Sequence, residues 1–419
     1  MGMPQFKLLL IWSTLLVLPG CQTTGIPKTD PGGKAVSYSR SAEIPQSARP
    51  NDATISLYET RRKEFIRWRN AQGRMYSIKP KGNSVPFKQE PAATSVTLDR
   101  ELSEGYLLSY LYYEDGVIKY NGKARDGRFA SNVNNQTLFF THSTGKSIVS
   151  YIVGHAICDG YITSMDEIID WPMMRKTLYQ GQPLRNLLNM SAGDRHTVDK
   201  ATTRVMGSGI HHRDIGFDAV AELLAGTKSG PKEVFYNNVL TDVIANYVAF
   251  KAGEKYDDLM RKVFQDKIKI EHEVLFEQHE STFIGWDPSP FYGQPQTRAS
   301  YSFFMTRMDF LRTAEAMMKD YQNQTCVGQY LKEAQSQARD WYREAGDRYN
   351  ITTWKYGAQF YFGFDGMRDR NIFLTVGGNG QNMMIDMDNS RIVVTNSAAR
   401  GWDKLTFILE VIKSGKLPE

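Results

Sequence analysis

Segments with a β-strand pattern lie near both ends of this 419-residue chain, and a long stretch with a helical pattern separates them. Near the first end, the aromatic and aliphatic runs Tyr106–Tyr113 and Val117–Tyr120 flank an Asp-Gly pair, which predicts a β-hairpin. Further strands are predicted at Gly357–Gly363, Ile372–Val376, Gln381–Met387 and Arg391–Asn396. We therefore predict an α+β fold with one central antiparallel sheet, built from about residues 100–140 and 350–419.

The stretch between these ends carries apolar residues at helical spacing. Stripes of this kind occur within Val239–Val248 and Met308–Met318, and the C-terminal segment Trp402–Lys413 has the same spacing. They predict helices that flank the sheet and a mainly helical lobe over about residues 144–340. The charged segment Gln335–Arg348 is predicted to be a surface helix.

The N-terminus has the layout of a secretory signal. Lys7 precedes an apolar run that is too short to span a bilayer comfortably, and Cys21 follows it. This layout resembles a bacterial lipoprotein signal, in which Cys21 becomes the lipidated first residue. We expect a signal peptide over 1–20, a lipidated cysteine and flexible tether over 21–51, and a globular domain over 52–419. The expected location is the bacterial cell envelope, with a lipid anchor in the outer membrane and the domain facing the periplasm.

The charge and the cysteine and histidine content bear on three possible features: nucleic-acid binding, a disulfide and a metal site. The formal net charge of +5 is small for this length, and acidic and basic residues are interspersed, which argues against a dedicated nucleic-acid binder. Besides Cys21, the chain has Cys158 and Cys326, which an export compartment would permit to pair. Cys158 lies inside an apolar helical pattern, which favours a buried free thiol over a disulfide. The seven histidines show no metal-binding spacing, so we expect no metal ion and no cofactor.

Ser143 and Lys146 stand three residues apart at the start of an apolar helical pattern. This spacing would place both side chains on one face of a helix. Burial would lower the pKa of Lys146 from its ordinary value of about 10.4, and the helix N-terminus would favour a developing alkoxide on Ser143. Chance matches to Ser-x-x-Lys are common, so this pair alone identifies no site.

A second segment, Tyr236-Asn237-Asn238, immediately precedes an amphipathic helix. From there Tyr236 could accept the serine proton and later return it to a leaving group. The Asn238 amide could hold Lys146 and a substrate carbonyl at once. Taken alone, the segment equally fits a buried structural tyrosine beside an asparagine cap.

A third segment is rich in glycine and runs from Thr375 to Gln381 on a predicted inner strand. Glycines permit close approach of a substrate and leave backbone amides able to donate. The amides of Gly378 and Ser143 could together form an oxyanion hole. A plain glycine-rich hairpin is the alternative interpretation.

All three segments occur in order in one chain, with two more: Gly160–Glu167 and Leu184–Gly193. From about Tyr106 to the C-terminus, this set resembles the serine β-lactamase and penicillin-binding-protein-like superfamily. The likeness is greatest to its class C-like branch of esterases, D-amino-acid peptidases and 6-aminohexanoate-dimer hydrolases. The resemblance implies a central antiparallel sheet flanked by helices, with a mainly helical second lobe.

The resemblance also implies roles for individual residues. Ser143 would be the acyl-forming nucleophile and Lys146 and Tyr236 the proton-transfer pair. The supporting and substrate-binding positions would be Asn238, Thr375, Gly377 and Gly378. The chain departs from the family at Thr375-Val376-Gly377, because lactamases and peptidases have lysine or histidine where Thr375 stands.

This departure shifts the expected reaction towards a carboxylic ester or a small amide, cleaved through an acyl-enzyme on Ser143. A β-lactamase or D,D-peptidase is the alternative within the superfamily. A catalytically silent binding or scaffold lipoprotein is the alternative from another class. The expected partners are a small ester, amide or peptide-like substrate and a membrane reached through the lipid anchor.

Overall fold

A computed structural model describes the chain over 50–51, single positions between 53 and 64, 75–91, 93–125, 129–198, 217–280, 295–343, 351–399 and 401–419. The predicted signal, Cys21 and almost all of the tether lie outside these ranges. Within them, no helix is both long enough and apolar enough to cross a membrane.

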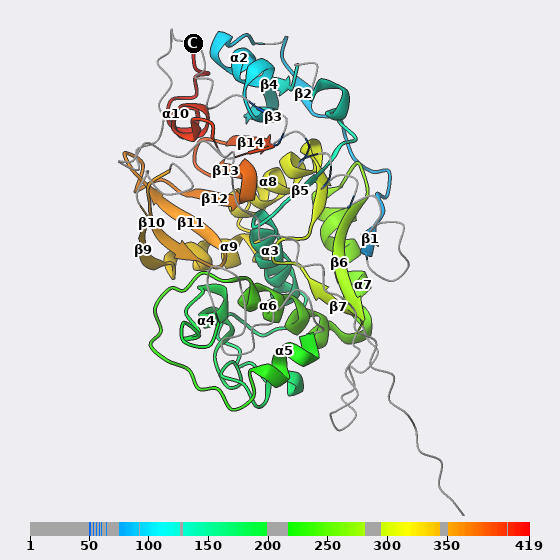
Figure 1. The fold of residues 1–419 in the computed structure, drawn as a ribbon, viewed down its shortest axis with the longest axis vertical. Coiled ribbons are helices and arrows are strands. Elements are labelled where there is room, and N and C mark those ends of the chain that lie inside the picture. The colour runs from blue at the N-terminus through cyan, green and yellow to red at the C-terminus, as the bar shows by residue number, and fades with distance from the viewer. Residues whose placement is uncertain are drawn as a thin grey trace, which may run out of the picture.

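Nine strands form the large sheet, and all neighbours are antiparallel except β2 and β4. Across the sheet the order is β2 (Lys88–Gln89), β4 (Val117–Lys123), β3 (Leu107–Glu114), β14 (Arg391–Ser397), β13 (Gln381–Asp386), β12 (Ile372–Gly377), β11 (Phe360–Phe364), β10 (Thr353–Gly357) and β9 (Arg339–Arg343). β3 pairs with β14 inside the sheet, with Tyr112 opposite Val393. Both ends of the chain therefore build one antiparallel sheet, which confirms the predicted fold class (Figure 1).

Helical elements cover both faces of this sheet. Tyr110 and Tyr113 are an odd number of positions apart on β3, so they point to opposite faces. The Tyr110 hydroxyl donates to the Phe407 carbonyl at 2.6 Å, in the C-terminal π-helical turn Leu405–Leu409. The Tyr113 hydroxyl donates to Glu315 at 2.7 Å, on α8 (Arg307–Gln322). The sheet is thus the middle of three layers.

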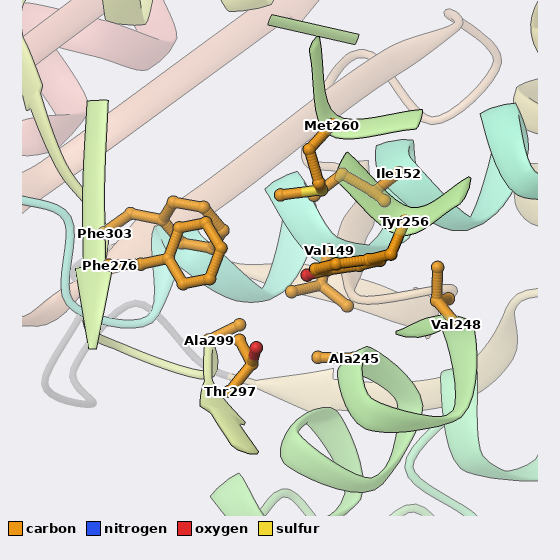
Figure 2. A pocket seen from close by; sticks show the side chains of 10 residues that line it. All are labelled: Val149, Ile152, Ala245, Val248, Tyr256, Met260, Phe276, Thr297, Ala299 and Phe303. Atoms are coloured by element: carbon orange, nitrogen blue, oxygen red, sulfur yellow. The ribbon is translucent and has the colours of Figure 1, made fainter. Parts of the chain in front are cut away.

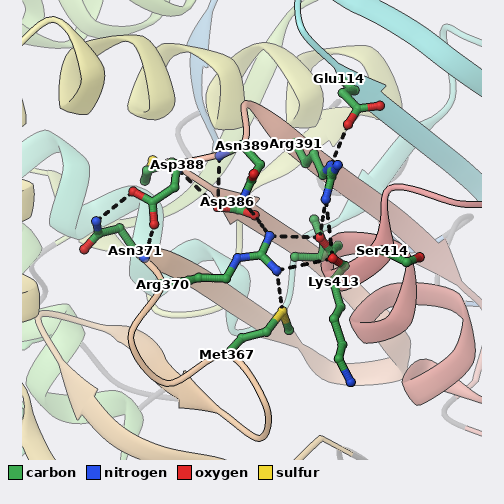
Figure 3. A network of polar contacts seen from close by, with 12 residues as sticks. Glu114, Met367, Arg370, Asn371, Asp386, Asp388, Asn389, Arg391, Lys413 and Ser414 are labelled. Carbon is green, nitrogen blue, oxygen red and sulfur yellow. Dashed lines mark hydrogen bonds and ion pairs between the residues drawn. The ribbon is translucent and has the colours of Figure 1, made fainter.

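Two arginines from the sheet region fasten the last helix, α10 (Glu410–Ser414). Arg370 and Arg391 both donate to the Ile412 carbonyl, at 3.0 and 3.2 Å. Figure 3 shows both guanidinium groups at this helix end, with Arg370 also paired to Asp386 and Arg391 to Glu114. Cations at a helix C-terminus satisfy carbonyls that lack a partner within the helix. The contacts therefore hold α10 against the sheet.

We predict that Gly415→Ala will weaken this attachment. Gly415 has a φ of +71°, and an added Cβ would lie 2.4 Å from Nη2 of Arg391. The substitution should reduce the free energy of unfolding by about 2 kcal/mol, measured by urea denaturation. Gly160→Ala is the matched control, because Gly160 has a φ of +78° in open space. It should cost only about 1 kcal/mol for the backbone conformation; equal losses in both variants would contradict the displacement of Arg391.

The helix α3 (Thr144–Cys158) lies in the centre of the molecule (Figure 1) and is buried from Thr144 to Ala156. It packs against α6 (Asn238–Ala252), α9 (Cys326–Ser336) and the strands β12 and β13. A central helix that is apolar on most sides is what the sequence predicted. Its burial sets the environment of every side chain that projects from it.

A disulfide joins Cys158 to Cys326, with a Cα–Cα distance of 5.8 Å. The prediction of a buried free thiol was therefore wrong. Cys158 is the last residue of α3 and only partly buried, and Cys326 is the first residue of α9. At these helix ends the two side chains face each other, whereas the apolar pattern suggested an interior position.

A second, five-stranded sheet was not predicted. Its order is β1 (Met75–Ile78), β6 (Val274–Glu280), β8 (Phe304–Thr306) and β5 (Leu138–Phe140), with β7 (Pro295–Arg298) beside β6. The surface helix predicted for Gln335–Arg348 is wrong, because α9 ends at Ser336 and β9 follows. Along β9 exposure alternates from residue to residue, with Asp340 and Tyr342 turned to solvent.

The remaining helices are short. The α-helices are α2 (Val96–Glu104), α4 (Leu184–Leu188), α5 (Phe217–Leu223) and α7 (Tyr256–Arg261). A π-helical stretch and four 3-10 turns complete the described elements: Lys262–Ile268, Ala130–Asn132, Pro172–Met174, Gly253–Lys255 and Gly378–Gly380.

Candidate active site

Ser143 stands at the N-terminus of α3, at the end of a tight turn that follows β5. The residue before it, His142, has a φ of +48°, a conformation that non-glycine residues rarely adopt. The Phe140 and His142 rings meet edge to face at 4.4 Å. The turn thus directs the chain sharply from the strand into the buried helix and leaves Ser143 partly exposed at its positive end.

Lys146 lies one turn further along α3, and its side chain is almost completely buried. Its Nζ donates to Ser143 Oγ at 3.2 Å, to Asn238 Oδ1 at 2.5 Å and to the Ser300 carbonyl at 2.9 Å. The predicted contact between residues i and i+3 is therefore present. Three separate parts of the chain supply the acceptors for one amine.

Burial lowers the pKa of Lys146 to about 7, and the carboxylate of Asp242 opposes this shift. Asp242 is buried on α6, and its Oδ1 accepts from the Ser300 amide at 2.9 Å. It thereby positions the Ser300 carbonyl that accepts from Lys146. Sequence reasoning missed Asp242, although its spacing of four residues from Asn238 places both on one helix face.

Tyr236 lies next to the amine, with its ring centroid 5.0 Å from Lys146 Nζ. Trp341 of β9 stacks on this ring at 6.1 Å and 11°, and Tyr356 of β10 meets it edge to face at 5.8 Å. Aromatic contacts on two sides fix the orientation of the ring. The structure therefore brings Ser143, Lys146 and Tyr236 together with Asn238, and their catalytic roles stay a prediction.

A buried carboxyl group holds the segment that carries Tyr236. Asn237 caps α6 by accepting from the Leu240 amide at 3.1 Å, and its Nδ2 donates to Asp194 at 3.0 Å. Asp194 also accepts from the Tyr179 hydroxyl at 2.9 Å, and burial raises its pKa to about 6. Asp194 directly follows Leu184–Gly193, a segment that resembles the superfamily. The sequence therefore offered a reason to consider Asp194 as part of the site.

The glycine-rich strand β12 passes the start of α3. The Thr144 hydroxyl donates to the carbonyl of Gln381, the first residue of β13, at 2.8 Å, which links α3 to the end of the glycine-rich segment. A Cβ on Gly377 would lie 2.3 Å from the Thr141 carbonyl, and one on Gly378 would lie 3.2 Å from the His142 ring. Gly378 therefore lies beside the turn that carries the serine, as an oxyanion donor must.

The side chain of Thr375, also on β12, points into the protein interior. Its side chain is fully buried, and its hydroxyl oxygen accepts from the Met383 amide at 3.0 Å. It also lies 3.4 Å from the Thr144 hydroxyl. Its polar atom therefore serves the packing of the strand against α3.

A small cavity lies behind α3, between side chains of α6, α7 and the second sheet (Figure 2). It has a volume of about 10 Å³, which is room for no more than one water molecule. Its walls are mostly apolar, so it is a packing gap. Among the described residues, no three His, Cys, Asp or Glu side chains lie where they could share a metal ion.

The pKa of Lys146 can be tested through the rate at which a fluorophosphonate labels Ser143. If the neutral amine accepts the serine proton, the labelling rate should rise with pH through about 7. Asp242→Asn keeps an oxygen acceptor for Ser300 but removes the charge that raises the pKa, so the midpoint should move to lower pH. Asp258→Asn, at an exposed position on α7, is the control. An unchanged midpoint in Asp242→Asn would contradict this coupling.

Comparisons with known proteins agree on the fold. No family model and no curated protein matches the chain. A solved structure from Bacillus anthracis, which carries the provisional name 6-aminohexanoate-dimer hydrolase, matches with a TM-score of 0.55 at 14% identity; the match covers 82% of this chain and 92% of that one. The D-amino acid amidase from Ochrobactrum anthropi SV3 matches with a TM-score of 0.52 at 14% sequence identity, and the match covers 74% of this chain and 95% of the amidase. A penicillin-binding protein from Bacillus halodurans matches with a TM-score of 0.50 at 13% sequence identity, and the match covers 73% of this chain and 97% of that protein.

Proposed function

Since the chain has the fold of the serine β-lactamase and penicillin-binding-protein-like superfamily, we propose that it is a serine hydrolase that cleaves a carboxylic ester or a small amide. The observation that carries this proposal is the buried Lys146 amine, 3.2 Å from Ser143 Oγ, with a pKa lowered to about 7. An amine that is neutral at this distance can accept the hydroxyl proton near neutral pH.

The reaction proceeds in two steps. Ser143 Oγ attacks the substrate carbonyl while its proton passes to Lys146, directly or through the Tyr236 hydroxyl. The same pair then returns this proton to the departing alcohol or amine, and an acyl-enzyme is left on Ser143. In the second step the pair takes a proton from water and the resulting hydroxide attacks the acyl carbonyl. The pair then returns this proton to Ser143 Oγ as the acyl bond to the serine breaks, and the acid is released. The amides of Ser143 and Gly378 stabilise the oxyanion in both steps.

We expect an ester or amide substrate, rather than a β-lactam, because of a residue on β12. Thr375 stands where lactamases and peptidases of the superfamily have a cation, and its side chain is buried. A substrate at this strand would therefore be held by backbone groups, which suits an ester or amide that has no carboxylate next to the scissile bond. β-Lactam hydrolysis and D,D-peptidase activity are the alternative, and labelling with a fluorescent penicillin would support it.

We also propose that the domain is exported and anchored through a lipid on Cys21. The disulfide between Cys158 and Cys326 supports export, because disulfides persist mainly in oxidising compartments. Metabolic labelling with a fatty acid tests the anchor directly, since Cys21→Ala should abolish the incorporation of label.

The first experiment is intact mass spectrometry of the protein that starts at Gln22, before and after exposure to a fluorophosphonate. We expect one adduct on the wild type and none on Ser143→Ala. Lys146→Met should slow labelling by about 100-fold or more, because the base is lost. A screen of 4-nitrophenyl esters and anilides then identifies the preferred bond.

Two results would overturn the proposal. An adduct that persists on Ser143→Ala would assign the reactive group to another residue. No adduct on either protein, with circular dichroism showing that both are folded, would favour the catalytically silent scaffold.

A further inference from the structure

An open pocket of about 610 Å³ adjoins the candidate active site. Trp341 lines it, and the indole of this residue also stacks on Tyr236. The volume lies within the range of sites for small molecules. The charged side chains in its lining are Arg195, Lys232, Glu233, Arg339, Asp340 and Lys355.

The pocket is within reach of a substrate bound at Ser143. Steps of 3.2, 5.0 and 6.1 Å lead from Ser143 Oγ to Lys146 Nζ, then to the Tyr236 ring and to the Trp341 ring. The indole therefore lies at most about 15 Å from the serine oxygen. A flexible chain of about twelve carbons attached to the scissile carbonyl can span this distance.

The positive charges of the pocket exceed the negative ones, four to two. Arg195 is paired with Glu233 at 3.0 Å. Asp340 of β9 lies opposite Lys355 of β10 in the strand register. Within the described part of the chain, no carboxylate lies within 4.0 Å of the charged nitrogens of Lys232, Arg339 or Lys355.

Lys232 is held by neutral acceptors. Its Nζ donates to Gln182 Oε1 and Ser229 Oγ, each at 2.5 Å, and to the Ala192 carbonyl at 3.0 Å. Burial lowers the pKa of Lys232; the nearby carboxyl of Asp194 opposes this effect and the Arg339 guanidinium adds to it. Arg339 itself donates to the Lys232 carbonyl at 2.9 Å. Two cations that repel each other beside an open pocket would gain from a bound anion.

We propose that this pocket binds a carboxylate at the far end of the substrate acyl chain, while the ester or amide carbonyl of the same molecule lies at Ser143. Arg339, Lys232 and Lys355 provide the positive charge, and Arg339 can bind a carboxylate through two nitrogens. Trp341 provides an apolar wall for the intervening chain. The substrate class is thus a monoester or monoamide of a dicarboxylic acid. This inference rests on the proposed function and specifies its substrate.

Binding tests the pocket apart from catalysis. In Ser143→Ala, isothermal titration calorimetry compares the monoanilide of dodecanedioic acid with its methyl ester, which lacks the charge. The acid should bind about tenfold more tightly. Adding Lys355→Gln should reduce this preference about threefold, and adding Arg339→Gln as well should abolish it. Lys355 is exposed and forms no hydrogen bond or ion pair with the described residues, so its substitution leaves the fold intact.

Lys88→Gln, an exposed change on β2, is the matched control and should keep the preference. Equal binding of the acid and the methyl ester to Ser143→Ala would overturn the pocket proposal. So would a preference that survives both pocket substitutions.

Kinetics of the wild-type protein separate the two proposals. The acidic 4-nitrophenyl ester of dodecanedioic acid should have a lower KM than its methyl-capped form, and Lys355→Gln should reduce this difference in KM. Equal turnover of both esters would leave the serine hydrolase standing and remove the carboxylate pocket. Preferred binding of the acid without turnover of either ester would retain the pocket and remove the hydrolase.

Discussion

The burial of a single amine, that of Lys146, is the constraint on which the arrangement of the site depends. A lysine in the protein interior loses its hydration, so it must find acceptors and tends to become neutral. Here the acceptors come from the start of α3, from Asn238 on α6 and from the backbone at Ser300. The same burial that lowers the pKa of the amine therefore requires that three distant segments meet at one point.

Buried polar groups, more than loop packing, set the positions of the reactive side chains. Asp242 of α6 accepts from the Ser300 amide, and Asp194 accepts from the Asn237 side chain. Partners outside the first layer of a site commonly decide its precision. Trp341 stacks on Tyr236 and also lines the open pocket, so it lies between the candidate site and the pocket. The candidate site and the pocket that we propose for a substrate carboxylate are thus connected through one aromatic contact.

The sequence predicted the elements whose own side chains carry the pattern. The β3–β4 hairpin and the strands β12, β13 and β14 follow from local alternation and turns, and the meeting of Ser143 with Lys146 follows from helical spacing. The second sheet escaped prediction because β5 and β8 have three residues each, and β1 pairs with β6 across nearly 200 positions. Trp341 was placed on a surface helix because its charged neighbours hid the alternation of β9. Its proximity to Tyr236 exists only in the folded chain.

The pairing of β3 with β14 has a consequence for how the molecule assembles. These strands are nearly 300 residues apart in sequence, so the contact order is high and the sheet cannot close until the end of the chain is available. Gly378 joins Ser143 only in that final arrangement. The large sheet is therefore completed only when β14 can pair with β3, and the candidate site that includes Gly378 is assembled at the same stage.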